Sequence, residues 1–225
     1  MAITLQEIAK LLDHSTLQPF LTEDDIIIGC DIALQYDTAT VCARPGDMPL
    51  VVKRLTGSSV LPCTVIGFPH SAHHTSVKCF EAERALDDGC KELDMVLNIG
   101  QMLKGNEQYV QDEIQKLAEI AHNQDAILKV ILETCYLNDE QKRIACRLSE
   151  AAGADFVKTS TGFGSSGATV EDVKLMRKTV GRKMGVKAAG GIRDLDSALA
   201  LIDAGANRLG CSASVDIVEA FSKRI

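Results

Sequence analysis

Short apolar segments alternate with longer amphipathic segments eight times along this chain. The apolar segments have the length of β-strands, and the segments between them, such as residues 106–122, repeat apolar residues with the 3.6-residue period of a helix. Such an alternation indicates an α/β fold with a parallel sheet. The expected strands are Leu11–Ser15, Ala39–Ala43, Pro62–Gly67, Glu92–Asn98, Leu128–Glu133, Asp155–Ser160, Gly185–Ala189 and Asn207–Cys211.

Two parallel-sheet architectures fit this alternation, a closed barrel and an open doubly wound sheet. Eight units in 225 residues leave about 28 residues per unit, which fits a (β/α)8 TIM barrel forming one domain over residues 1–225. The open sheet often carries a GxGxxG motif after its first strand, where this sequence reads HSTLQPF. The fourth strand also has Glu92 and Asp94 on one face but Leu93 and Met95 on the other, whereas a sheet covered on both faces is apolar on both. We therefore favour the barrel.

Capping residues and glycines predict where several helices begin and end. Thr22 and Thr169 each precede acidic residues and an apolar run, which is typical of a helix N-terminus. Four glycines stand just before expected strands, where a helix commonly ends in a left-handed residue; they are Gly89, Gly153, Gly181 and Gly205.

Charge and cysteine usage exclude several classes of protein. The chain has 31 acidic and 24 basic residues, and a net charge of −7 disfavours nucleic acid as a partner. No apolar run approaches the roughly 18 residues of a membrane span, and the N-terminus lacks a signal-peptide pattern, so we expect a cytoplasmic protein without membrane contact. The eight cysteines include no CxxC pair, which argues against a zinc site and favours small apolar residues in a reducing compartment.

Three ionisable side chains interrupt otherwise apolar strand segments. They are Asp94 in ELDMVLN, Lys158 in DFVKTSTG and Lys187 in GVKAAGGI. Each alone is compatible with a structural ion pair, because lysine is rarely buried without a partner. In a barrel, however, the carboxyl ends of strands four, six and seven meet at one mouth, where the active sites of this fold are built. We therefore predict that the three side chains form a catalytic group.

Two neighbouring ammonium groups give this catalytic group its chemistry. At about 4 Å and an effective dielectric constant near 20 they repel by roughly 4 kcal/mol, which brings the pKa of one lysine from about 10.4 toward 7–8. A neutral lysine amine attacks carbonyl groups and forms an iminium, and a nearby carboxylate such as Asp94 can then shuttle protons. Lys129 stays unassigned, and can pair inside the barrel with Asp94 or Glu133.

The loops after strands six, seven and eight suggest an anion site. Barrels often hold phosphate on backbone N–H groups of the last two of these loops. Gly190 and Gly191 allow the backbone to approach an anion closely, and Ser212 and Ser214 can add hydroxyl donors. Thr159 begins the segment that can add another wall.

Cys42 and a histidine cluster complete the candidate residues. Cys42 ends the second strand and is expected to line the mouth of the barrel. His70, His73 and His74 have no neighbouring acid or cysteine to complete a metal-ligand set, so we interpret them as a solvated loop.

Taken together, the motifs resemble those of the deoxyribose-phosphate aldolases, a family of class I lyases on a TIM barrel. The segments that carry the resemblance span nearly the whole chain: LLDHSTL (11–17), TVCARP (40–45), VIGFPH (65–70), ELDMVLNIG (92–100), KVILET (129–134), FVKTSTGFG (156–164) and VKAAGGIR (186–193). The resemblance implies reversible cleavage of 2-deoxy-D-ribose 5-phosphate into D-glyceraldehyde 3-phosphate and acetaldehyde, with no metal and no organic cofactor.

The resemblance also implies a role for each motif residue. Lys158 becomes the Schiff-base nucleophile, Lys187 the neighbour that tunes it, and Asp94 the proton donor and acceptor. Asp13 corresponds to a position that binds a substrate hydroxyl and holds the lysine network. Some relatives carry a lysine after KTSTG where this chain has Phe163, so phosphate binding here is expected to rely on amides and hydroxyls. Some also end in a tyrosine that assists proton exchange, whereas this chain ends in SKRI.

Two other functions stay open on the sequence. A non-catalytic phosphosugar-binding protein would use the anion loops but would not need the lysine pair. Another class I aldolase, or a transaldolase-like enzyme, would use the same lysines on a different donor. The exposed rim of a barrel commonly forms dimers, which makes a homodimer one expectation, but the sequence does not decide the oligomeric state.

Overall fold

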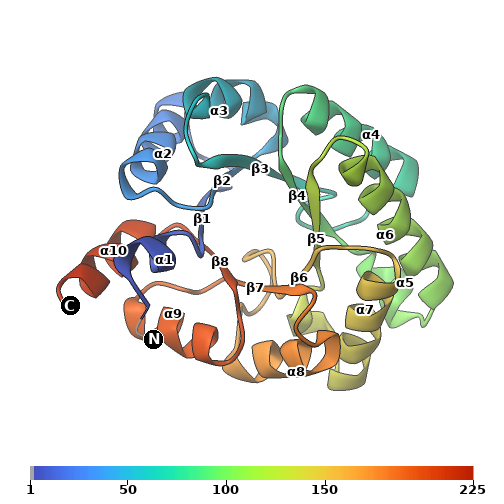
Figure 1. Ribbon diagram of the computed structural model, residues 1–225. Coiled ribbons are helices and arrows are strands. Elements are labelled where there is room, and N and C mark those ends of the chain that lie inside the picture. Colours follow the sequence, from blue (N-terminus) through green and yellow to red (C-terminus); the bar gives the residue numbers. More distant parts are fainter. Residues whose placement is uncertain (1–2, 225) are drawn as a thin grey trace.

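Eight parallel strands pair in the order of the sequence and close into a barrel where β8 pairs with β1. This architecture comes from a computed structural model that describes residues 3–224, and Figure 1 shows the strands as a ring inside the helices. The predicted TIM barrel is thereby confirmed. The strands are β1 (Leu12–Thr16), β2 (Thr40–Ala43), β3 (Leu61–Ile66), β4 (Glu92–Val96), β5 (Ile127–Ile131), β6 (Phe156–Lys158), β7 (Gly185–Ala189) and β8 (Arg208–Cys211).

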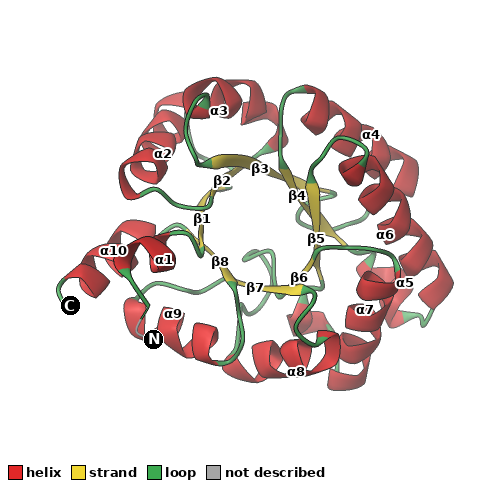
Figure 2. Ribbon diagram, in the orientation of Figure 1, coloured by secondary structure: helices red, strands yellow, loops and turns green. Residues whose placement is uncertain are grey.

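Helices cover the outside of the barrel between successive strands, as Figure 2 shows. Those of the described residues are α1 (Leu5–Ala9), α2 (Glu23–Tyr36), α3 (Met48–Leu55), α4 (Thr75–Asp87), α5 (Ile99–Leu103), α6 (Glu107–His122), α7 (Asp139–Ala151), α8 (Val170–Val180), α9 (Leu195–Asp203) and α10 (Ser214–Ser222). Two short 3-10 helices, η1 (Pro45–Asp47) and η2 (Thr134–Tyr136), follow β2 and β5. Within residues 3–224, no helix is long and apolar enough to cross a membrane.

The local signals of the sequence act as expected. The Thr22 side chain accepts a hydrogen bond from the Asp25 N–H and forms a capping box at α2, and Thr169 caps α8 in the same way without the reciprocal bond. All four predicted helix-ending glycines have positive φ. The eight strands lie where they were predicted, but β4, β5 and β6 end two residues early, because the chain turns into the loops that form the mouth of the barrel.

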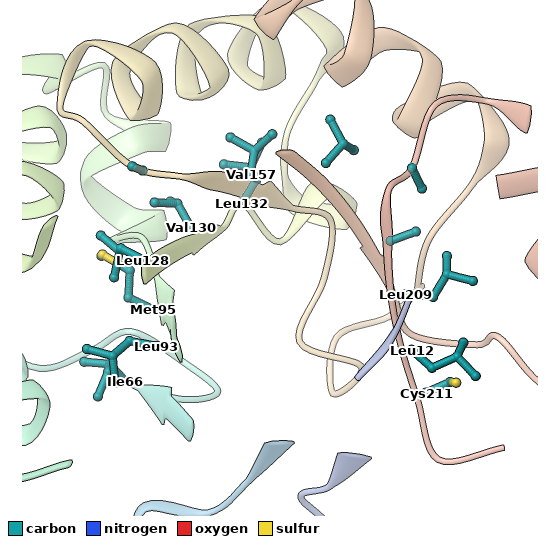
Figure 3. Close-up of a cluster of buried hydrophobic side chains, with 14 of the residues drawn as sticks. Leu12, Ile66, Leu93, Met95, Leu128, Val130, Leu132, Val157, Leu209 and Cys211 are labelled. Carbon is teal, nitrogen blue, oxygen red and sulfur yellow. The ribbon is translucent and has the colours of Figure 1, made fainter. Parts of the chain in front are cut away.

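Alternation along the strands separates an apolar layer outside the barrel from a charged centre inside it. Residues that point outward, such as Leu93, Met95, Leu128 and Val130, pack under the helices as an apolar shell (Figure 3). The intervening residues point into the barrel, and many of these are charged. The centre of the barrel is therefore ionic, while the free energy of hydrophobic burial comes from the shell around it.

Candidate active site

Lys158 and Lys187 lie side by side on adjacent strands and point to the same face. They are register partners of β6 and β7, and paired strands lie about 4.8 Å apart. Lys158 Nζ lies 2.7 Å from Asp94 Oδ2, and Lys187 Nζ lies 2.6 Å from the same oxygen. The structure thus brings the three predicted catalytic residues together, but with the carboxylate between the two ammonium groups.

Asp94 is held from its other side by a third lysine. Lys129 Nζ donates to Asp94 Oδ1 at 2.7 Å and lies 2.6 Å from Glu92 Oε2. Of the two partners that the sequence allowed for Lys129, the structure selects Asp94. Glu133 instead turns to the loop after β6, where it accepts hydrogen bonds from the backbone N–H and the hydroxyl of Thr161.

Asp13 contacts Lys187 from a neighbouring part of the barrel interior. Its carboxylate lies 2.5 Å from Lys187 Nζ and 2.7 Å from Arg208 Nη1, and Arg208 in turn lies 3.1 Å from Glu92. Asp13 is therefore joined to the lysine pair through Lys187, and the roles that the resemblance implies for it stay predictions. We call the seven groups connected in this way the ionic network: Asp13, Glu92, Asp94, Lys129, Lys158, Lys187 and Arg208.

The ionic network fixes the protonation of most of its members. Burial alone would raise the pKa of Asp94, but the three lysine ammonium groups outweigh it and hold that pKa well below its ordinary value. Burial alone would lower the pKa of Lys187, but the carboxylates of Asp13 and Asp94 keep that pKa raised. The pKa of Lys129 is also raised despite its burial, and the Asp94 carboxylate is the largest cause of that increase. With every group ionised, four cations face three carboxylates, so the network carries one positive charge in excess.

Lys158 is the member of the ionic network that reaches a cleft. A cleft of about 220 Å³ opens at the carboxyl ends of β1, β6, β7 and β8, and Lys158 is the one network cation among the described residues that line it. Phe163 and Thr161 form one wall of the cleft. A substrate in this cleft would meet the Lys158 amine directly, with Lys187 behind it.

The predicted anion loops after β7 and β8 line the same cleft. Gly190, Gly191 and Ser212 line it, and within residues 3–224 the N–H groups of Gly191 and Ser212 donate to no other backbone group. Gly190 has a φ of +89°, and a Cβ on Gly167 would lie 2.1 Å from the Gly190 oxygen, so two glycines are needed for this close approach.

Arg193 is a functional candidate that the sequence interpretation missed. It lines the cleft beside the glycines and is exposed. The sequence signal that could have identified it is its position directly after AAGGI, in the loop that follows β7. Arg193 therefore gives the cleft a cation in the same loop as Gly190 and Gly191, and a guanidinium matches a phosphate geometrically.

Four residues expected to contact substrate do not line the cleft. The Thr159 hydroxyl binds the backbone of Ala189 as both donor and acceptor, because Thr159 faces away from the barrel centre. Ser214 is buried at the start of α10 and forms a 2.5 Å hydrogen bond with His14 Nδ1. Asp13 is a fully buried member of the ionic network, and Cys42 is buried in the barrel.

Cys42 lies against a second thiol that sequence spacing did not reveal. Cys42 on β2 is the register partner of Cys63 on β3, and their sulfur atoms and an Asp94 oxygen lie within 4.8 Å of one another. The absence of a CxxC pair argued against a zinc site, whereas the pairing of β2 with β3 brings two separate cysteines together. Among the described residues this is the one group of three or more such side chains with metal-ligand spacing, and the histidine loop is not part of it.

Comparisons with known proteins agree with this geometry. Residues 8–218 match the DeoC/LacD family aldolases. A protein of Thermococcus gammatolerans named deoxyribose-phosphate aldolase is 54% identical over 215 residues, which cover 95% of this chain and 96% of that one. One of the same name from Caldanaerobacter subterraneus subsp. tengcongensis is 50% identical over 222 residues, covering 98% and 96%. The structure is also similar to that of the deoxyribose phosphate aldolase of Aeropyrum pernix, described as a tetramer, with a TM-score of 0.92 and 31% identity over 99% of this chain and 94% of that one.

Proposed function

We propose that this chain, which belongs to the DeoC/LacD family of aldolases, reversibly cleaves 2-deoxy-D-ribose 5-phosphate into D-glyceraldehyde 3-phosphate and acetaldehyde through a Schiff base on Lys158. One observation carries the proposal: of the four cations in the ionic network, Lys158 lines the cleft. The names of the relatives at about 50% identity support the choice of substrate.

The charge of the ionic network supports Lys158 as the neutral amine. Lys158 contacts one carboxylate, Asp94, whereas Lys187 contacts two. Loss of the Lys158 proton would bring the network to zero net charge, and an uncompensated buried charge is costly. The member with the fewest carboxylate partners and direct access to the cleft is therefore the one that can act as a nucleophile.

The reaction follows from the neighbours of this amine. Lys158 Nζ attacks the aldehyde carbon, and loss of water from the carbinolamine gives an iminium. Removal of the proton from the C3 hydroxyl then breaks the C2–C3 bond, the electrons pass into the iminium as an enamine, and the triose phosphate leaves. Protonation of the enamine and hydrolysis release acetaldehyde. Asp94 Oδ2, in contact with Lys158 and Lys187, is placed to move protons to and from the nitrogen.

The part of the cleft lined by Gly190, Gly191 and Ser212 would hold the phosphate. The free N–H groups of Gly191 and Ser212 supply donors, and Arg193 supplies a charge. This arrangement supports a phosphorylated substrate in a protein whose overall charge is negative, because the anion is held locally rather than by a basic surface.

Covalent trapping tests the nucleophile. Borohydride reduction with acetaldehyde is expected to add one label to the chain, which peptide mass spectrometry places on Lys158. Lys158→Arg is expected to lose both the label and the cleavage of deoxyribose 5-phosphate, which is assayed by triose-phosphate detection in the presence of a metal chelator. Lys174→Arg, at an exposed lysine of α8, is the matched control and is expected to keep both.

The same assays separate the other functions that the sequence left open. A non-catalytic phosphosugar-binding protein would take no label. Labelling of Lys158 without cleavage of deoxyribose 5-phosphate would indicate an aldolase for another substrate, and a label on another lysine would refute the assignment of the nucleophile.

A further inference from the structure

A buried pair of thiols lies on the opposite side of Asp94 from the reactive lysine. Cys42 and Cys63 face each other across β2 and β3, and neither is exposed. The Cys63 sulfur lies 3.5 Å from Asp94 Oδ1, the oxygen that does not contact Lys158. Two sulfur atoms and one carboxylate oxygen therefore surround a single point inside the barrel.

We propose that Cys42, Cys63 and Asp94 bind a thiophilic divalent cation such as Zn²⁺, and that the bound ion switches the aldolase off. Zinc takes thiolate sulfur at about 2.3 Å and carboxylate oxygen at about 2.0–2.2 Å in a tetrahedron, which puts neighbouring ligand atoms about 3.5–3.8 Å apart. The distance from the Cys63 sulfur to Asp94 Oδ1 already has this value. Two thiolates and one carboxylate also leave a fourth position for water.

The thiols allow a cation to enter a site that already carries excess positive charge. On binding, each sulfur exchanges its S–H bond for a bond to the metal, and two protons leave to solvent. A divalent ion enters as two protons depart, so the net charge of the barrel interior is unchanged. Carboxylates that are already ionised offer no such exchange. Lys129 Nζ lies 3.5 Å from the Cys63 sulfur and can donate a hydrogen bond to the thiolate.

One side chain contacts both the thiol pair and the cleft. Leu17 packs against the cluster of Cys42, Cys63 and Val65, and it also lines the cleft beside Lys158. We therefore infer that a small ion enters from the cleft past Leu17.

The expected effect on catalysis follows from the position of Asp94. A metal on Oδ1 replaces the contact with Lys129 at 2.7 Å and draws electron density from the carboxylate that Lys158 and Lys187 share. The carboxylate then becomes a weaker proton acceptor for the amine. Inhibition rests on the proposed function, whereas binding of the metal does not.

Cobalt absorption tests the site independently of activity. Titration of the intact protein with Co²⁺ under reducing conditions is expected to produce thiolate-to-cobalt charge-transfer absorption that saturates at one ion per chain and disappears on addition of Zn²⁺. Cys42→Ala and Cys63→Ala are each expected to abolish the absorption, and circular dichroism verifies that at least one of them is folded. Cys79→Ala and Cys135→Ala, at the two half-buried cysteines, are the matched controls and are expected to retain it.

Activity measurements then test the switch. Zn²⁺ is expected to inhibit deoxyribose 5-phosphate cleavage at least tenfold in the wild-type protein, and to leave Cys63→Ala at its own metal-free rate. The site is refuted if folded wild-type protein shows no such absorption, or if the absorption survives in Cys63→Ala. Binding without inhibition refutes the switch. Absence of cleavage in metal-free protein contradicts the proposed function instead, and the cobalt spectrum still decides the site.

Discussion

Replacement of Lys187 by leucine tests how the ionic network makes the Lys158 amine reactive. Lys187 is fully buried, and its ammonium shares Asp94 Oδ2 with Lys158. In the wild-type protein, the network reaches zero net charge when Lys158 is neutral. In Lys187→Leu it reaches zero net charge when Lys158 is protonated, so the substitution favours the unreactive form.

The magnitude follows from the separation of the two nitrogens. Two charges about 5 Å apart interact by roughly 3 kcal/mol at an effective dielectric constant of 20. This energy corresponds to about a 10²-fold change in the fraction of neutral amine, or a displacement of the pH–activity profile by about two pH units. We expect cleavage at pH 7 to fall about 10²-fold and to recover as the pH rises, because alkaline conditions restore the neutral amine.

The assay is the rate of deoxyribose 5-phosphate cleavage between pH 6 and 10, with circular dichroism to verify folding. Lys78→Leu is the matched control, since Lys78 is equally buried and lies 2.8 Å from Glu113, outside the ionic network. It is expected to lower stability without displacing the pH profile. A near-native rate for Lys187→Leu at pH 7, or a loss of equal size at every pH, would show that charge coupling is not what activates Lys158.

Three further predictions concern the proposed phosphate site and the fold. Arg193→Ala is expected to raise the KM for the phosphorylated sugar roughly 10–100-fold with little change in kcat, since hydrogen bonds to charged groups contribute about 1.5–3 kcal/mol; an equal loss with unphosphorylated deoxyribose would contradict this role. Gly167→Ala places a Cβ 2.1 Å from the Gly190 oxygen and is expected to raise the same KM and to lower Tm, as measured by kinetics and calorimetry. Gly46→Ala is the control and should alter neither quantity, because a Cβ at Gly46 would have no atom within 4 Å. Burial lowers the pKa of His14 from 6.5 to about 4, so the fold keeps the neutral imidazole. The free energy of unfolding, measured in urea, should therefore be retained above pH 6.5 and fall by about 3 kcal/mol as the pH drops to 4, and a constant value would refute this linkage.

Periodicity explains how much of the fold was predictable. The alternation of strands and helices placed all eight strands, and the period of two within β4 placed Asp94 inward and Leu93 outward. The same period puts Thr159 on the face opposite Lys158, so its assignment to substrate binding conflicted with the pattern that located the lysine.

Strand register and loop shape explain what the sequence could not give. Cys42 and Cys63 are far apart in the chain, and only the pairing of β2 with β3 brings them together. Arg208 begins β8, where a basic residue also suits a solvated strand end, and its partners are Asp13 on the adjacent strand β1 and Glu92 on β4, which does not pair with β8. Arg193 lines the cleft because the loop after β7 folds over the strand end, and no local period predicts that direction.

The ionic interior of the barrel is better explained by positioning than by stability. Buried ion pairs commonly contribute no more to stability than well-packed apolar residues of the same volume, because desolvation offsets their attraction. Here they hold one carboxylate on both of its oxygens: Oδ1 contacts Lys129, while Oδ2 contacts Lys158 and Lys187. A carboxylate held in this way cannot rotate toward solvent, so a proton that it accepts at Oδ2 stays within reach of the Lys158 nitrogen. A rigid proton acceptor beside one accessible amine is what repeated formation and hydrolysis of an iminium require, and this requirement gives the physical reason why charged residues occupy the centre of the barrel while the apolar residues lie outside it.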